Sequence, residues 1–79
     1  ALIWAARKGE TLILVTADHE TGGLALVDGS VEHGRVEARF PTTTHTGVMV
    51  PVFAAGPGAE AFIGIYENTA VFEKMRAAL

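Results

Sequence analysis

Four apolar residues in a row, Leu12, Ile13, Leu14 and Val15, constrain the fold of this chain more than any other feature. The run consists of β-formers and does not alternate with polar residues, which is the pattern of a strand covered on both faces. Such strands occur in α/β sheets, where ligands gather beyond the carboxyl ends of the strands. The residues that follow Val15 are therefore the first candidates for a functional site.

Those residues are Thr16-Ala17-Asp18-His19-Glu20-Thr21-Gly22-Gly23. A carboxylate and an imidazole side by side can bind a divalent metal, and zinc accepts both ligand types. The alternative is that Asp18 caps a turn and His19 is an ordinary loop histidine. The strand-end position favours metal ligation. Glu20 is either a partner that orients His19 or, as we slightly favour, a solvated carboxylate. Thr21 either approaches a bound oxyanion or only forms the turn.

From this octapeptide onward the chain resembles the bacterial alkaline phosphatases, whose C-terminal part carries Thr-Ala-Asp-His and later His-Thr-Gly. The second motif here is Thr44-His45-Thr46-Gly47. The resemblance continues through residues 48–58 and the helix start Tyr66-Glu67-Asn68-Thr69, so it covers nearly the whole chain. It implies an α/β fold, specifically the C-terminal part of a three-layer α/β/α fold.

The resemblance also implies a metal centre. Asp18 and His19 would hold the zinc that activates the nucleophile, and His45 would hold a second zinc beside the leaving group. Two metals about 4 Å apart can clamp both oxygens of an in-line displacement. The alternative for His45 is a loop histidine bonded to neighbouring threonines. No residue matches the family's nucleophile, its phosphate-binding arginine, its remaining zinc ligands or its magnesium site, so no catalytic residue is assigned.

The function that the resemblance implies is hydrolysis of phosphate monoesters through two zinc ions and a covalent phosphoenzyme, with magnesium as a further cofactor. We expect this activity in the full-length enzyme and none in these 79 residues alone. Within enzymes, the alternatives are a related phosphodiesterase, sulfatase or phosphomutase. A different class of alternative is a non-catalytic metal-binding or interaction module.

Length and composition agree with a partial domain. A chain of 79 residues buries only about 60% of its unfolded surface. Yet 49% of the residues are hydrophobic, so we expect residues 1–79 to form one partial domain whose apolar surfaces are covered by missing parts or by a second copy in a dimer. Since the sequence begins inside a predicted helix, we expect it to come from a longer protein.

Charge and cysteine content exclude several other classes of protein. The formal net charge of −3, without a basic cluster, argues against a nucleic-acid partner. No stretch is long enough to span a membrane, so no membrane partner is expected. The absence of cysteine excludes disulfides and thiolate zinc sites. The resemblance implies a periplasmic or extracellular location.

Local patterns predict the remaining elements. A helix is expected over residues 1–8, ending at Gly9, and a hairpin over residues 24–28 and 35–40 with an exposed His33 in its turn. Residues 48–55 read as a second apolar strand that contains Pro51, while residues 59–65 stay ambiguous between a helical turn and an extended piece.

A final helix is predicted to be capped by Asn68 or Thr69. Its apolar residues fall on one stripe at helical spacing: Val71, Phe72, Met75, Ala78 and Leu79. Among the aromatic residues, Trp4, Phe53, Phe62 and Phe72 are expected in the core. Tyr66 is expected there as well, with a partner for its hydroxyl.

Overall fold

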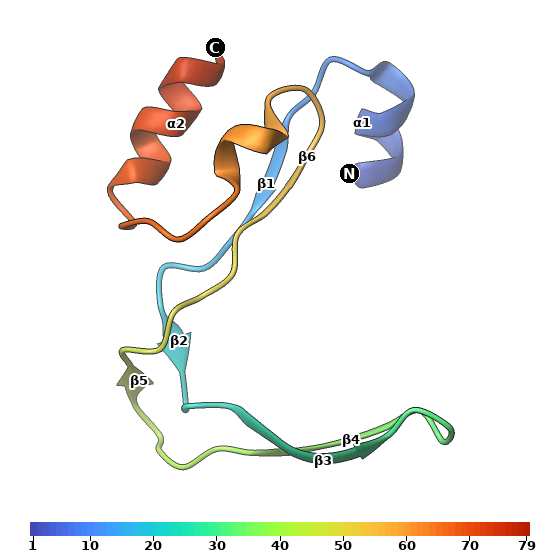
Figure 1. Ribbon diagram of the computed structural model, residues 1–79, viewed down its shortest axis with the longest axis vertical. Coiled ribbons are helices and arrows are strands. Elements are labelled where there is room, and N and C mark those ends of the chain that lie inside the picture. The colour runs from blue at the N-terminus through green and yellow to red at the C-terminus, as the bar shows by residue number, and fades with distance from the viewer. The chain divides into compact units, whose positions relative to one another are not determined.

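The computed structural model describes all 79 residues, and the chain divides into two compact units (Figure 1). Unit 1 comprises Ala1–Ala17 and Pro51–Leu79, and unit 2 comprises Asp18–Val50. Unit 1 contains α1 (Leu2–Lys8), β1 (Ile13–Val15), β6 (Phe53–Ala55), the 3₁₀ helix η1 (Ala59–Phe62) and α2 (Ala70–Ala78). Unit 2 contains β2 (Glu20–Thr21), β3 (Ala25–Ser30), β4 (Arg35–Arg39) and β5 (His45–Thr46).

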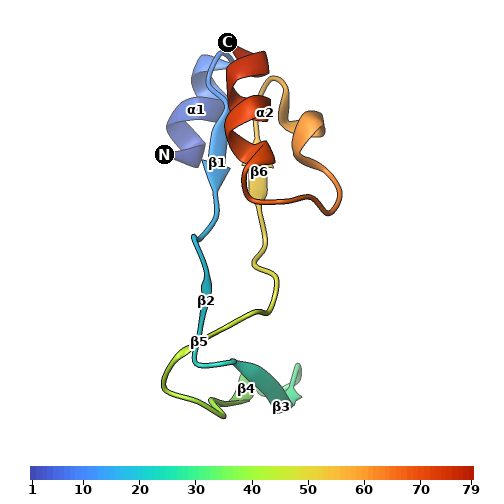
Figure 2. The same ribbon diagram turned by 90° about the vertical axis from the view of Figure 1, so that its left-hand side faces the viewer.

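In unit 1, α1 confirms the predicted helix, and β1 confirms a strand in the apolar run. The expectation that this strand is covered on both faces is wrong for the chain by itself, because β1 has one neighbouring strand and Val15 is 54% exposed. The helix ends at Gly9, which adopts a left-handed conformation with φ of 72° and donates its N–H to the Ala5 carbonyl. This is the conformation that favours glycine after a helix. β1 then pairs antiparallel with β6, with Ile13 opposite Ala55 and Val15 opposite Phe53, and Figure 2 shows the two strands side by side.

The strand predicted over residues 48–55 is wrong for residues 48–52, because β6 covers only Phe53–Ala55. Pro51 lacks an N–H and cannot donate to a ladder, so the pairing starts after it. The Pro51 carbonyl instead accepts a hydrogen bond of 2.9 Å from the Thr16 hydroxyl. β1 also ends at Val15, so the apolar residues before Phe53 have no strand to pair with.

The C-terminal part of unit 1 is helical. The ambiguous segment forms η1, and the predicted final helix is confirmed as α2. Thr69 occupies the N-cap position without a side-chain capping bond. The first helical N–H groups bond instead to backbone carbonyls, Ala70 to Glu67 and Val71 to Asn68. The Tyr66 hydroxyl donates to the Phe62 carbonyl at 3.1 Å, which confirms that it has a partner.

The core of the chain is small. Ala5 and Phe62 are its buried hydrophobic residues. Trp4, Phe53 and Phe72 are 58–64% exposed, so the expectation that they form the core is wrong for the chain by itself. The apolar stripe of α2 contains no buried residue. The reason is that every sheet has only two strands, all antiparallel, and no second layer covers these side chains.

Unit 2 is built on two antiparallel pairs. β3 and β4 form the predicted hairpin, with Leu26 opposite Ala38, Asp28 opposite Glu37 and an irregularity between Leu26 and Asp28 (Figure 1). At the base of the hairpin β2 pairs with β5. Two backbone hydrogen bonds extend this pairing, from the Gly22 N–H to the Thr44 carbonyl and from the Thr42 N–H to the Gly22 carbonyl. Neither helix of the chain has the length and apolarity needed to cross a membrane.

Candidate metal centre

The two histidines singled out by the sequence lie side by side in unit 2. His19 directly precedes β2 and His45 is the first residue of β5. The antiparallel pairing of these strands places Thr21 opposite His45 and Glu20 opposite Thr46. As a result, the two imidazole ring centroids are 3.6 Å apart, with an angle of 34° between the ring planes. Residues from the two sequence motifs therefore meet at one place.

Asp18 and His19 have the geometry of a ligand pair. His19 Nδ1 is 3.1 Å from the Glu20 carbonyl oxygen, which can only accept, so Nδ1 carries the proton in this contact. Nε2 is then left with its lone pair, and it lies 3.5 Å from Asp18 Oδ2. Two ligands of a tetrahedral zinc with bonds near 2.1 Å are separated by about 3.4 Å. The donor set and its spacing thus fit a zinc ion.

The Thr21 hydroxyl lies between the two histidines. Its oxygen is 3.4 Å from His19 Nδ1 and 3.2 Å from His45 Nδ1. A hydroxyl oxygen can accept from both rings, which leaves Nε2 of each ring as the free donor atom for a metal. From the sequence, Thr21 was interpreted only as a turn residue or as a contact to a bound oxyanion. No local signal reveals this role, because it depends on a strand pair that closes over 24 residues.

The side chain of Glu20 differs from both interpretations made from the sequence, while its main-chain carbonyl is the partner of His19 Nδ1. Its Oε1 accepts hydrogen bonds from the Gly23 N–H at 2.6 Å and the Leu24 N–H at 3.1 Å. Its Oε2 accepts the Thr46 hydroxyl. The carboxylate is therefore neither free in solvent nor turned toward His19. The Thr46 hydroxyl, and after it the N–H groups of Leu24 and Gly23, hold the pKa of Glu20 below its ordinary value, against the opposing effect of partial burial.

The candidate metal centre is open, and it is incomplete within the chain. The Asp18 side chain is 87% exposed and that of His19 is 41% exposed. No three histidine, aspartate or glutamate side chains converge on one point. A catalytic zinc is normally held by three protein ligands, so each zinc would need ligands beyond these 79 residues. His33 is exposed in the hairpin turn, as predicted.

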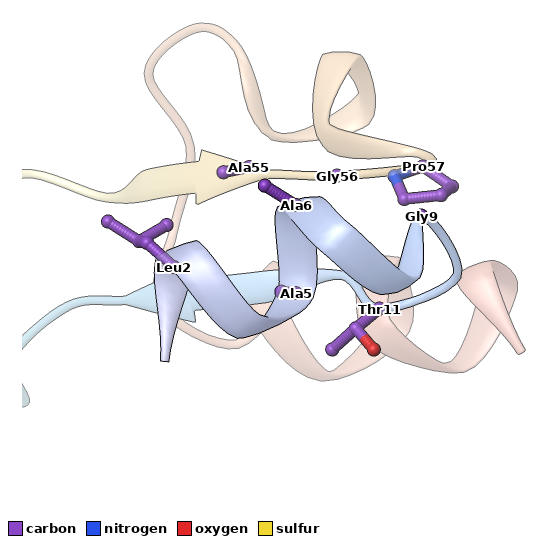
Figure 3. A pocket seen from close by; sticks show the side chains of 8 residues that line it. All are labelled: Leu2, Ala5, Ala6, Gly9, Thr11, Ala55, Gly56 and Pro57. Carbon is purple, nitrogen blue, oxygen red and sulfur yellow. The ribbon is translucent and has the colours of Figure 1, made fainter.

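A hollow in unit 1 carries no comparable chemistry. It has a volume of about 490 Å³ and lies between α1 and the end of β6 (Figure 3). Its lining is apolar or uncharged: Leu2, Ala5, Ala6, Gly9, Thr11, Ala55, Gly56 and Pro57. Because no titratable side chain faces it, the chemistry of the chain is concentrated at the two histidines.

Comparison with known proteins shows that the chain is similar to phosphatases. The sequence model of the alkaline phosphatase family matches residues 30–79. Streptomycin-6-phosphate phosphatase of Streptomyces griseus is 35% identical and alkaline phosphatase of Escherichia coli is 33% identical, each over the whole chain. The chain spans only 21% and 20% of the length of these relatives.

Solved structures agree with the sequence relatives. Alkaline phosphatase from the Antarctic bacterium TAB5 is 43% identical, with a TM-score of 0.84 over 99% of this chain and 24% of its own. A mutant of the TAB5 enzyme with Mg bound in the M3 site gives a TM-score of 0.82 at 40% identity, over 98% of this chain and 25% of its own. The chain therefore matches about a quarter of the length of these solved structures.

Proposed function

The chain belongs to the alkaline phosphatase family, and on that premise we propose that it contributes to the two-zinc centre of an enzyme that hydrolyses phosphate monoesters. Asp18 and His19 bind one zinc, and His45 binds the other. The observation that carries this proposal is the pairing of β2 with β5, which sets the His19 and His45 rings 3.6 Å apart. Metal pairs that act on phosphoryl groups are separated by about 3.5–4 Å, so adjacent rings can each serve one metal.

Each residue has a distinct task in this proposal. Asp18 supplies a charged oxygen ligand, and His19 supplies Nε2 because its Nδ1 is engaged by the Glu20 carbonyl. His45 supplies its own Nε2, since its Nδ1 faces the Thr21 hydroxyl. Bound zinc would lower the pKa of the nucleophile and stabilise the charge on the leaving oxygen.

The remaining catalytic groups lie outside this chain in the proposal. They are the nucleophile that forms the covalent phosphoenzyme, the arginine that binds phosphate, the other zinc ligands and the magnesium ligands. Ser30 ends β3 in the hairpin, and no motif of the nucleophile type surrounds it. We therefore expect the 79 residues alone to be inactive. Magnesium in a TAB5 enzyme supports a magnesium site in the complete protein.

The placement in the fold is part of the same proposal. The TM-score of 0.84 supports the assignment of the chain to the C-terminal part of a three-layer α/β/α domain. In that setting the exposed aromatic side chains and the α2 stripe would be covered by other elements. A dimer and a periplasmic or extracellular location stay predictions, to be tested by light scattering and by cell fractionation.

The test uses the product of the complete open reading frame. We expect His19→Ala and His45→Ala to lose bound zinc and turnover of a chromogenic phosphate monoester, because each removes a zinc ligand. His33→Ala is the matched control, since His33 is an exposed histidine of the same unit. Near-normal zinc content and turnover in His19→Ala would refute the assignment.

The same purified protein can be used to distinguish phosphomonoester hydrolysis from the alternative functions. Preferential hydrolysis of a phosphodiester or a sulfate ester would identify a related phosphodiesterase or sulfatase, and phosphate transfer within a sugar phosphate would identify a phosphomutase. Zinc binding without turnover of any of these substrates would identify a non-catalytic metal-binding module.

A further inference from the structure

The strand pair that joins the two histidines is very short. β2 and β5 are each two residues long, and their pairing has only two positions, Glu20 with Thr46 and Thr21 with His45. Two backbone hydrogen bonds at Gly22 extend the pairing on the hairpin side, but none extends it on the side of His19. Yet the distance between the histidines depends on this pairing, because His19 directly precedes β2 and His45 lies in β5. An additional link between the strands is therefore important for the metal centre.

Glu20 provides this link. One carboxylate oxygen is anchored on its own segment by the N–H groups of Gly23 and Leu24, and the other accepts the hydroxyl of Thr46 on the opposite strand. Glu20 follows His19 directly, and Thr46 follows His45 directly. Hydrogen bonds to a carboxylate are shorter and stronger than those between neutral groups. Both Glu20 and Thr46 are partly buried, which reduces competition from water.

We propose that Glu20 is a positioning residue of the metal centre, which sets the separation of His19 and His45 by tying the two strands together through Thr46. The inference rests on the proposed zinc-binding function. Glu20 does not ligate the metal, because both of its oxygens are engaged by other groups. Since the link joins both motifs, its loss weakens binding of both zinc ions rather than one.

The experiment measures zinc affinity by competition with a chromophoric chelator, in the product of the complete open reading frame. Glu20→Ala removes the link, and Thr46→Val removes only the hydroxyl while keeping the shape of the side chain. We expect each to weaken zinc binding about 10-fold, the lower end of the range for outer partners of a metal site, because Glu20 acts through the strands and does not contact a ligand with its carboxylate. Glu32→Ala is the control, because Glu32 is an exposed acid in the hairpin turn with no ion pair or side-chain hydrogen bond.

Two further variants distinguish positioning from charge. Glu20→Gln keeps a carbonyl for Gly23 and Leu24 and gains an amide that can donate to the Thr46 hydroxyl, so it should bind zinc within a few-fold of the unsubstituted protein. The double variant Glu20→Ala/Thr46→Val should bind zinc no more weakly than the weaker single variant, because both substitutions remove the same link.

The outcomes separate this inference from the proposed function. Unchanged zinc affinity in Glu20→Ala and Thr46→Val, or equal losses in Glu20→Ala and Glu20→Gln, would overturn the positioning role even if the enzyme is a phosphatase. Zinc binding without phosphomonoester turnover in the unsubstituted protein would refute the proposed function alone. If Glu20→Ala does not fold, unchanged zinc affinity in Thr46→Val is sufficient to overturn the role.

Discussion

Replacement of Gly56 by alanine should strongly destabilise unit 1, where β1 pairs with β6. Gly56 directly follows β6 and has a φ of 108°, a conformation that other residues rarely adopt. A Cβ at this position would lie 2.2 Å from the Thr11 carbonyl oxygen and 3.2 Å from Leu12 Cα. Ordinary van der Waals contacts are 3.4–4 Å long, so both distances are too short and the backbone before β1 must move to accommodate the methyl group.

Gly64 offers a control that isolates this contact. Its φ of 107° matches that of Gly56, but a Cβ there would meet nothing within 4 Å. Backbone strain of this kind costs about 1–3 kcal/mol, and it applies to both positions. Overpacking adds about 1–3 kcal/mol more, and it applies only to Gly56→Ala. The difference between the two variants therefore measures the steric contact with Thr11.

The assay is urea denaturation of the purified protein, with unfolding monitored by circular dichroism. We expect Gly56→Ala to lower the free energy of unfolding by at least about 1 kcal/mol more than Gly64→Ala. An equal or larger loss in Gly64→Ala would show that the Thr11 carbonyl does not restrict Gly56, and the described approach of the two segments would be wrong.

Three further predictions concern single side chains. Thr21→Val should weaken zinc binding about 10-fold, because it removes the hydroxyl between the Nδ1 atoms of the two histidines. Thr21→Ser should retain most of the zinc affinity, and chelator competition measures both variants. Acidification should weaken the hydrogen bonds of Glu20. Because folding lowers the pKa of Glu20 below 4.5, the stabilisation from this carboxylate is complete above pH 4.5 and is lost as the pH falls through the pKa of the folded state. The amide resonances of Gly23 and Leu24 should shift in that range, and shifts unchanged in Glu20→Gln would contradict this. Lys74→Met should destabilise the protein by about 1 kcal/mol, because Nζ donates to the Ala61 carbonyl at 2.7 Å and lies 4.5 Å above the Tyr66 ring; an unchanged thermal midpoint would refute this.

Elements with local signals could be predicted from the sequence. The helix that ends at Gly9, the β3–β4 hairpin and α2 all depend on residues close together in the chain, such as a left-handed glycine or an apolar stripe at helical spacing. The strand predicted before Phe53 was wrong because apolar composition alone does not supply a partner strand, and Pro51 cannot donate to one. Of the aromatic residues expected in the core, Phe62 is buried, whereas Trp4, Phe53 and Phe72 are exposed because their burial depends on layers that this chain does not form by itself.

For the metal centre, the sequence identified residue types but not their supports. Asp18, His19 and His45 could be selected from their motifs, and their role as ligands stays a prediction. The contacts of Glu20 and Thr21 could not be predicted, because they reach partners 26 and 24 residues away across the β2–β5 pair. A glutamate in the sequence Glu20-Thr21-Gly22-Gly23 gives no indication that its carboxylate will accept a hydrogen bond from a hydroxyl of another strand.

Backbone hydrogen bonds close the base of the hairpin, and this closure bears on how the length of the hairpin can vary in evolution. Hydrogen bonds between Gly22 and both Thr42 and Thr44 fasten the two ends of the hairpin beside the histidines. The chain between these ends can therefore grow or shrink without moving the histidines, at a closure cost of about 0.6 kcal/mol for each doubling of its length. We therefore expect the hairpin to tolerate insertions that leave the two histidines and the proposed zinc binding unchanged. A flexible insertion after Glu32 that left zinc affinity unchanged would demonstrate this tolerance.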